Sequence, residues 1–329
     1  MSRLNRLLKH INIFDKRNRN HLLYYISYYL RLENPINKPF VIDIETTNMC
    51  NARCIMCPRS NMKRPIKFLE WRTFKKIIDE AYPYTEKVLL HMFGEPLLHK
   101  DLIKMIKYCK TKGIPEVLIS TNGMFLTEKI SRKIINSGLD TLIICLDGNT
   151  KETHEKIRPN TNYDVIVKNI EKYVKILGQK KKPKTILQFI EMKENKHEVD
   201  DFIYRWSKFD NLIINIKICE TWAGTVKGHE LVKIENEKFP CPKLWYSISI
   251  FSDGSIGICC RDYDKFVVVG DAKKERIYDV WHSKKMKTLR KFHIEKQFEK
   301  ISLCKDCIEW YWEKHPHIVE IRKNVIKST

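Results

Sequence analysis

From Pro39 onward, short β-branched apolar runs alternate with longer amphipathic segments. Apolar runs bounded by turn-forming residues are typical of buried strands, and apolar positions three and four residues apart are typical of helices. The pattern predicts strands at 40–45, 87–92, 116–120, 140–146, 185–191 and 212–218. It predicts helices near 71–82, 99–112, 127–137, 163–178 and 196–208.

Six strand–helix units in succession favour a parallel sheet that is buried on both faces. We therefore expect an α/β fold, namely a partial (β/α)6 barrel of the TIM type. In such barrels, ligands bind at the loops that follow the strands.

The alternation stops after about residue 219. The run YSISIFSDGSIGI contains two short β-type segments around Asp253-Gly254, which predicts a hairpin, and residues 276–292 have a helical pattern. We divide the chain into a helical extension (1–38), a barrel (39–219), a small C-terminal domain (220–310) and a C-terminal tail (311–329).

The net charge of +21 comes from dispersed, mostly lysine side chains rather than from an arginine-rich arm. We therefore expect no nucleic-acid partner, and a metal-stapled nucleic-acid-binding protein is the remote alternative. No stretch reaches the roughly 18–20 apolar residues of a membrane span, so a cytoplasmic protein without a transmembrane segment is expected. The segment HLLYYISYYLRL predicts a helix packed on the barrel, with weak contact to a membrane surface as the alternative.

Eleven cysteines in short-spaced clusters indicate metal binding rather than disulfides. Cys50, Cys54 and Cys57 form a C-x3-C-x2-C set in TTNMCNARCIMCPRS, directly after the first predicted strand. A structural zinc site has four protein ligands. Three cysteines on a four-iron cluster leave one iron open, so the missing ligand is expected to be a small molecule.

Further motifs follow the next strands in order: HMFGEPLLH, STNGMFLT, CLDG, THEKIRPN and LQFIEMKEN. Together with the three cysteines they resemble the radical S-adenosylmethionine (radical SAM) enzymes. The resemblance implies a [4Fe-4S] cluster whose open iron is chelated by S-adenosyl-L-methionine. It also implies reductive cleavage of that cofactor to a 5′-deoxyadenosyl radical, which abstracts hydrogen from a substrate.

The resemblance implies cofactor contacts as well. It places Arg158 at the cofactor's carboxylate, a role that suits a bidentate guanidinium. Phe93 stands where the family has its first glycine, and Cys145 where it usually has serine. The resemblance places three further groups of residues at the cofactor. They are Gly94, Glu95 and Pro96 beside its amino group, Ser120 and Asn122 of the third strand and its loop, and Ile190 and Met192 around its adenine.

A second cysteine set resembles the SPASM domain, in its shortened twitch form with one auxiliary [4Fe-4S] cluster. The spacing C-x12-G-x4-C and the later C-x2-C carry this likeness, although Cys260 could replace its neighbour Cys259 and a four-cysteine zinc site fits the spacing too. Three other cysteines are expected to be buried apolar residues. The implied ligands are Cys241, Cys259, Cys304 and Cys307, and the buried residues are Cys109, Cys145 and Cys219.

The twitch arrangement is similar to that of 2-deoxy-scyllo-inosamine dehydrogenase-like enzymes. It implies an oxidoreductase that oxidises an alcohol of a sugar or aminocyclitol through the auxiliary cluster. The implied partners are this small-molecule substrate and a reductant such as flavodoxin or ferredoxin. Modification of a ribosomally made peptide and epimerisation of a sugar or peptide are the alternatives. The sequence singles out no catalytic base among Glu191, Lys193, Asp262 and Glu220.

Overall fold

The computed structural model describes residues 16–229, 237–310, 319–322 and 325–328. Its strands form one sheet in the order β10-β11-β6-β5-β4-β3-β2-β1-β7-β8-β9, which does not close on itself. The neighbouring strands from β1 to β6 are all parallel. The predicted partial barrel is confirmed.

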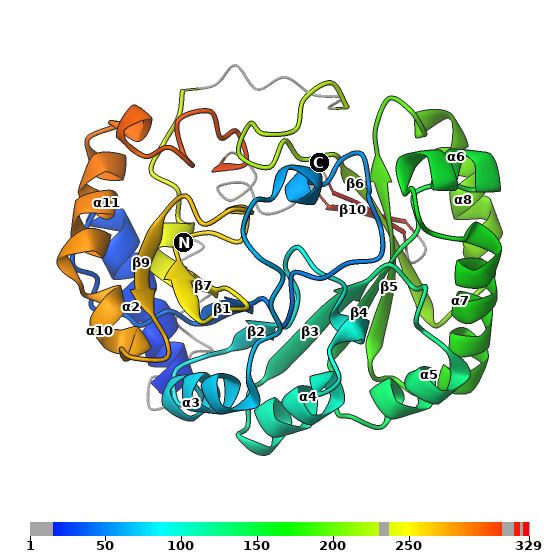
Figure 1. Cartoon of the computed structure of the whole chain (residues 1–329), viewed down its shortest axis with the longest axis horizontal. Coiled ribbons are helices and arrows are strands. Elements are labelled where there is room, and N and C mark those ends of the chain that lie inside the picture. Colours follow the sequence, from blue (N-terminus) through cyan, green and yellow to red (C-terminus); the bar gives the residue numbers. More distant parts are fainter. Residues whose placement is uncertain (1–15, 230–236, 311–318, 323–324, 329) are drawn as a thin grey trace, which may run out of the picture.

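The six predicted strands are all present. They are β1 (Val41–Ile44), β2 (Lys87–Leu89), β3 (Glu116–Thr121), β4 (Thr141–Cys145), β5 (Lys184–Glu191) and β6 (Leu212–Ile218). The helices that cover their outer face in Figure 1 are α3 (Trp71–Ala81), α4 (Leu102–Thr111), α5 (Glu128–Ile135), α7 (Tyr163–Leu177) and α8 (Val199–Trp206). A short helix that the pattern did not predict, α6 (Lys151–Ile157), follows β4.

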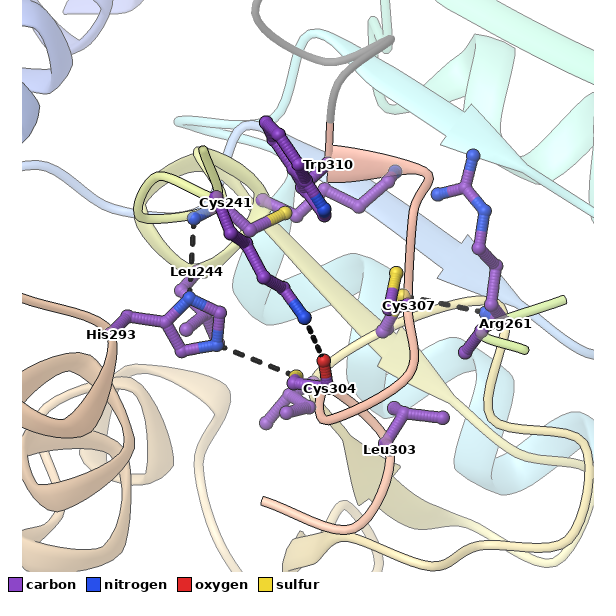
Figure 2. A pocket seen from close by; sticks show the side chains of 13 residues that line it. Cys241, Leu244, Arg261, His293, Leu303, Cys304, Cys307 and Trp310 are labelled. Carbon is purple, nitrogen blue, oxygen red and sulfur yellow. Dashed lines mark hydrogen bonds between the residues drawn. The ribbon is translucent and has the colours of Figure 1, made fainter. Parts of the chain in front are cut away.

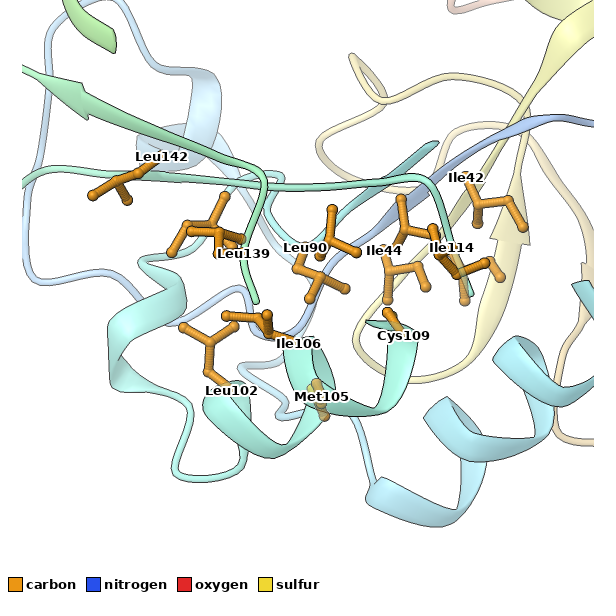
Figure 3. Close-up of a cluster of buried hydrophobic side chains, with 14 of the residues drawn as sticks. Ile42, Ile44, Leu90, Leu102, Met105, Ile106, Cys109, Ile114, Leu139 and Leu142 are labelled. Atoms are coloured by element: carbon orange, nitrogen blue, oxygen red, sulfur yellow. The ribbon is translucent and has the colours of Figure 1, made fainter. Parts of the chain in front are cut away.

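The main core lies between the sheet and these helices. Figure 3 shows Ile42 and Ile44 of β1 and Leu90 after β2 packed over Met105 and Ile106 of α4. Because side chains alternate along a strand, the residues between these positions face the concave inner side of the sheet.

The C-terminal domain extends the barrel sheet. Strand β7 (Ser247–Ile250) pairs in parallel with β1, and β8 (Ser255–Gly257) pairs antiparallel with β7, so the predicted hairpin at Asp253-Gly254 is confirmed. Strand β9 (Val268–Asp271) follows, with α9 (Lys243–Tyr246) before β7. The predicted helix at 276–292 is two helices, α10 (Ile277–Trp281) and α11 (Lys284–Ile294), because Ser283 caps the second by accepting from the N–H of Met286.

Helix α2 (Lys16–Tyr29) packs against the barrel, as predicted for HLLYYISYYLRL. Asn20 donates to the carbonyl of Lys38, and the Tyr28 hydroxyl donates to the carbonyl of Pro240. Residues 1–15, part of the predicted extension, lie outside the described residues. None of the helices described in the structure has the length and apolar character that a membrane span requires.

The segment assigned to a tail contributes two strands. Strands β10 (Val319–Arg322) and β11 (Val325–Ser328) pair antiparallel, and β11 adds in parallel to β6. The sheet therefore continues beyond the barrel on both sides.

Candidate functional site

The loop with Cys50, Cys54 and Cys57 leaves the carboxyl end of β1 and docks on the segment after α6. The N–H of Arg53 donates to the carbonyl of Pro159 at 2.9 Å, and the N–H of Ile55 donates to that of Ile157 at 3.0 Å. All three cysteines are free and partly buried. The structure thus places the first predicted site where barrel enzymes bind ligands.

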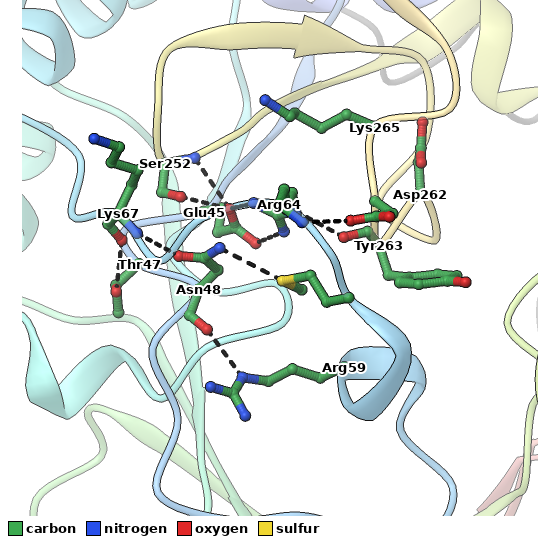
Figure 4. A network of polar contacts seen from close by, with 12 residues as sticks. Glu45, Thr47, Asn48, Arg59, Arg64, Lys67, Ser252, Asp262, Tyr263 and Lys265 are labelled. Carbon is green, nitrogen blue, oxygen red and sulfur yellow. Dashed lines mark hydrogen bonds and ion pairs between the residues drawn. The ribbon is translucent and has the colours of Figure 1, made fainter.

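Asn48 closes this loop on itself (Figure 4). Its side chain accepts from the N–H of Lys67 at 2.7 Å and donates to the carbonyl of Pro65 at 3.0 Å. Arg59 donates to the carbonyl of Asn48 at 2.9 Å. These bonds satisfy buried polar groups and hold the cysteines in a defined loop.

Glu45 joins the loop to the C-terminal domain. Its buried carboxylate accepts two bonds from Arg64, at 2.5 and 2.6 Å, and two from Ser252, at 2.8 and 3.0 Å. Arg64 also donates to the carbonyl of Tyr263 at 2.7 Å. A bidentate pair with both partners buried has fixed geometry, so the two cysteine regions are rigidly linked.

Gly94 brings the loop after β2 against the cysteine loop. A Cβ atom there would lie 2.0 Å from the carbonyl oxygen of Thr47 and 2.8 Å from that of Met49. Phe93, in place of the family's first glycine, packs against Trp222 and Tyr263 with ring centroids 5.3 and 6.4 Å apart. The phenyl ring therefore fills the space between the barrel and the C-terminal domain.

Glu95 is buried, and its carboxylate holds two loops. It accepts from the N–H of Leu97 at 3.0 Å, the hydroxyl of Thr121 at 2.7 Å and the N–H of Asn122 at 2.8 Å. Burial raises its pKa, while these three donors oppose that shift. With about four lone-pair directions on a carboxylate, one remains for a further donor.

Asn122 and Ser120, the predicted residues of β3 and its loop, reach different neighbours. The amide of Asn122 donates to the side chain of Asn51 at 2.9 Å and lies 4.0 Å from Cys50 Sγ. The hydroxyl of Ser120 lies 3.3 Å from the sulfur of Cys145. Asn122 therefore contacts the cysteine loop, and Ser120 lines the inner face of the sheet.

Arg158 lies beside the cysteine loop and is held by Asp147. Its Nη1 is 3.5 Å from Cys54 Sγ, and its Nε is 2.6 Å from Asp147 Oδ2. Both side chains of the ion pair are buried. Asp147 belongs to the CLDG motif but was not among the predicted site residues; the signal that could have found it is a carboxylate directly after a parallel strand.

Ile190 and Met192 lie in a small apolar cluster with Met56, Ile157 and Cys219, packed against Cys54. The N–H of Ile190 donates to Asp147 at 2.7 Å, and the N–H of Met192 donates to the side chain of Asn195 at 2.9 Å. The structure therefore brings this predicted segment to the cysteine loop, with these two N–H groups already paired.

The second cysteine set lines one cavity (Figure 2). Cys241, Cys259, Cys304 and Cys307 all contribute to its wall, whereas Cys260 does not. No three Cys, His, Asp or Glu side chains in the described residues are arranged around a single ion. The choice of Cys259 over Cys260 as a ligand stays a prediction, and the expected burial of Cys109, Cys145 and Cys219 is confirmed.

His293 and Arg261 line the same cavity and were not predicted. The His293 ring contacts both Cys241 and Cys304, and burial lowers its pKa to about 3. The backbone N–H of Arg261 donates to the sulfur of Cys259 at 3.5 Å. One lone histidine within a helix gives no sequence signal for such a role.

Two family models match the chain. The model of the radical SAM superfamily matches residues 44–203, and that of SPASM, an iron–sulfur cluster-binding domain, matches residues 241–308. Each match contains one of the two cysteine sets.

Three curated relatives show how far the likeness extends. An S-adenosyl-L-methionine-dependent 2-deoxy-scyllo-inosamine dehydrogenase of Niallia circulans is 23% identical over 81% of this chain and 92% of its own length. An uncharacterized protein of Methanocaldococcus jannaschii is 28% identical over 63% of the chain, and a probable GTP 3′,8-cyclase of Methanococcus maripaludis is 28% identical over 40%. The chain spans only 62% and 45% of the latter two proteins.

Solved structures share the fold. BtrN in complex with AdoMet and 2-DOIA matches with a TM-score of 0.59 and 19% identity, over 82% of this chain and 93% of BtrN. SuiB of Streptococcus suis bound to its precursor peptide matches with a TM-score of 0.65 and 15% identity, over 88% of this chain and 75% of SuiB.

The two domains imply a [4Fe-4S] cluster with S-adenosyl-L-methionine and an auxiliary cluster, and the cysteines fit these groups. Burial raises the pKa of the Cys57 and Cys304 thiols to about 12. Such thiols stay protonated at neutral pH until a metal displaces the proton. Three sulfur donors at one site and four at the other match an open and a closed cluster.

Proposed function

Since the chain belongs to the radical SAM superfamily and carries a SPASM domain, we propose that it oxidises an alcohol of a polar small molecule, a sugar or aminocyclitol, to a ketone. The likeness to 2-deoxy-scyllo-inosamine dehydrogenase over 92% of that enzyme supports this reaction class.

The proposed roles follow the two sites. Cys50, Cys54 and Cys57 hold the cluster that binds the cofactor, and Arg158 and Glu95 hold the cofactor's methionine end. When bound and reduced by a donor such as flavodoxin or ferredoxin, the first cluster and its cofactor would supply a 5′-deoxyadenosyl radical that removes a hydrogen atom, and the auxiliary cluster would accept an electron. The remaining proposed residues are Gly94, Pro96, Ser120, Asn122, Ile190 and Met192 around the cofactor, and Cys241, Cys259, Cys304 and Cys307 at the auxiliary cluster.

The observation that carries the proposal is the polarity of the sheet's inner face. Its side chains form hydrogen-bonded pairs, such as Ser249 with Asp43 at 3.3 Å and Asn215 with Gln188 at 3.5 Å. A substrate rich in hydroxyl and amino groups can form further hydrogen bonds with these side chains, whereas an apolar one only removes water from them. Apolar side chains of the same parity, such as Leu118, Ile143 and Ile186, lie among them. The polar residues on this face are Asp43, His91, Ser120, Gln188, Asn215, Lys217 and Ser249.

Oxidation of an alcohol also requires a proton acceptor, and the four residues considered from the sequence have other environments. Glu220 pairs with Arg261 at 2.9 Å and with Lys217. Burial alone would raise the pKa of Glu220, but these two cations hold it well below its usual range. Both carboxylate oxygens of Asp262 accept backbone N–H bonds, from Phe266 and Val267.

The other two residues lie at the end of β5 or beyond it. Glu191 has the same strand parity as Phe189, which is buried in the outer core, so it does not face a substrate on the inner face. Lys193 is exposed and follows β5. No contact among the described residues holds its amine at the inner face.

We propose His91 as the proton acceptor instead. His91 follows β2, next to Leu90 of the outer core, and the electrostatic effect of Lys217, which has inner-face parity on β6, indicates that the ring lies on the inner side. Its Nδ1 is buried and has no hydrogen-bond partner among the described residues. Burial lowers its pKa to about 4, against a hydrogen bond with the Leu118 backbone and with Lys87 and Lys217 acting in the same direction as burial, so the ring is neutral and can accept a proton at neutral pH.

The reaction then balances. The carbinol carbon loses a hydrogen atom, the hydroxyl loses its proton to His91, and one electron leaves, so the C–O bond becomes C=O. Loss of the electron leaves a protonated carbonyl, which is a strong acid. A weakly basic imidazole is therefore sufficient to accept that proton.

Peptide modification is the second candidate, and one observation favours it: the TM-score to peptide-bound SuiB, 0.65, exceeds that to BtrN, 0.59. The experiment that separates the two offers anaerobically loaded enzyme a panel of aminocyclitols and sugars, beginning with 2-deoxy-scyllo-inosamine, and a panel of peptides. We expect the small molecules alone to raise 5′-deoxyadenosine formation above background. Stimulation by peptides alone would contradict the proposal, and a product of unchanged mass would indicate an epimerase.

A further inference from the structure

His293 of α11 connects two cysteines that are 63 residues apart in the sequence. Its Nδ1 lies 3.2 Å from the backbone nitrogen of Cys241, and its Nε2 lies 3.4 Å from Cys304 Sγ. Figure 2 shows the ring between these two residues on the wall of the cysteine cavity. The side chain is 2% exposed, so water does not compete for either contact.

The contact with Cys241 fixes the tautomer of the ring. A backbone N–H can only donate, so His293 Nδ1 is the acceptor and carries no proton. A neutral imidazole with an unprotonated Nδ1 carries its hydrogen on Nε2. The Nε2–H group is therefore the one that faces the sulfur of Cys304.

Packing holds the ring in this orientation. The Phe298 ring meets it edge-on, with centroids 5.1 Å apart and planes at 84°. The amine of Lys238 donates to the backbone carbonyl of Cys304, which fixes the partner residue as well. The donor is therefore in place before any cluster binds.

We propose that His293 is a positioning residue that donates an Nε2–H hydrogen bond to the Cys304 sulfur of the auxiliary cluster and raises the reduction potential of that cluster. Hydrogen bonds to cluster sulfurs set the potential, because they stabilise the reduced form, which carries one more negative charge. The consequence that the cluster accepts the substrate's electron rests on the proposed function. The hydrogen bond and its effect on the potential do not.

The test compares His293→Leu, which removes the donor, with His293→Gln, whose amide can still donate. His282→Asn is the matched control, because His282 belongs to the same domain, directly after α10, and its ring bonds to the side chain of Asn34. The variants are made in full-length chain with Cys50, Cys54 and Cys57 replaced by Ala, so that one cluster remains. Redox titration followed by electron paramagnetic resonance measures its midpoint potential.

We expect the potential to fall in His293→Leu, to fall less in His293→Gln and to stay unchanged in His282→Asn. Equal potentials in all of them would overturn the proposal. If the Leu variant does not assemble a cluster, wild-type protein with ¹⁵N-labelled histidine decides: the reduced auxiliary cluster should show a weak ¹⁵N coupling, and its absence would overturn the proposal.

These outcomes are separate from the fate of the proposed function. If no alcohol is oxidised but the potential shifts, the hydrogen bond stands and the electron-transfer role fails. If alcohols are oxidised and the potential does not shift, the proposed function stands and the hydrogen bond from His293 fails.

Discussion

Arg158 and Asp147 form a buried ion pair in which Nε and Nη2 of the arginine each lie 2.6 Å from Asp147 Oδ2. The other carboxylate oxygen accepts from the N–H of Ile190 at 2.7 Å. One carboxylate thus fixes both the guanidinium next to Cys54 and the segment at the end of β5.

Breaking this pair should be costly. In Asp147→Asn, the guanidinium stays buried without its counter-charge, and removing one partner of a buried pair costs about 3–5 kcal/mol. We expect urea unfolding of the chain to show a loss of that order. Asp164→Asn is the control, because its ion pair with Lys151 is exposed and contributes about 0–1 kcal/mol. Equal losses in the two variants would contradict the importance of Asp147.

Gly94→Ala should separate the two loops at the cofactor site. The new Cβ would meet backbone oxygen at 2.0 Å, so the chain must move. We expect S-adenosyl-L-methionine binding to be lost while iron remains bound at the auxiliary site. Gly113→Ala is the control: nothing lies within 4 Å of a Cβ there, and its φ of +77° costs about 1–2 kcal/mol without affecting the cofactor site. Calorimetric titration with the cofactor measures the difference.

Glu95→Gln should weaken cofactor binding. Its two oxygens accept from Leu97, Thr121 and Asn122, and glutamine has only one acceptor oxygen, so at least one donor loses its partner. The charge that would face the cofactor's ammonium is lost as well. We expect the affinity for S-adenosyl-L-methionine to fall by about 1–3 kcal/mol, measured by anaerobic equilibrium dialysis, with the exposed Glu128→Gln as control. An unchanged affinity would restrict Glu95 to holding its loops together.

His91 should titrate far below a free imidazole. Its pKa is about 4 in the folded chain and about 6.5 in the unfolded chain. The unfolded state therefore binds a proton that the folded state lacks, and the stability from the neutral ring is complete above pH 6.5 and lost as the pH falls to 4. Deuterium exchange at the ring C2–H, followed by mass spectrometry over pH, measures this pKa. A midpoint near 6.5 would contradict the buried, neutral ring.

The same residue should affect turnover. In His91→Asn, the proton acceptor is missing, so we expect ketone formation to fall by about 10²–10⁴-fold while 5′-deoxyadenosine is still formed. Added imidazole should restore part of the ketone yield. His197→Asn, at an exposed histidine, is the control. Parallel loss of both products would indicate a structural role instead.

The strands of the barrel and their sequence along the chain could be predicted because each strand is a short apolar run and most of them lead into one of the motifs quoted above. The ends of β3, β5 and β6 fall within one residue of prediction, whereas β2 ends three residues early, since the chain turns there to bring Gly94 against Thr47. That close approach depends on tertiary contact, which the local pattern does not contain.

The pairing of β7 with β1 could not be predicted, because it joins residues about 200 positions apart and the hairpin alone gives no partner. Asp147, His91 and His293 were missed for a similar reason. Each has its role through neighbours that lie far away in the sequence: Arg158 and Ile190 for the first, Lys217 for the second, and Cys241 with Cys304 for the third. Cysteine spacing, in contrast, is local and was sufficient to group the seven predicted ligands.

The fate of the carbinol hydrogen distinguishes the oxidation of an alcohol from the other reaction classes. Anaerobically loaded enzyme is given 2-deoxy-scyllo-inosamine deuterated at its ring carbons, and the products are weighed by mass spectrometry. We expect one deuterium in 5′-deoxyadenosine, one cofactor consumed per product, and, from unlabelled substrate, a product lighter by two hydrogens. Deuterium-free 5′-deoxyadenosine with this substrate and with every other cyclitol and sugar of the panel, or a product of unchanged mass, would contradict the oxidation of an alcohol.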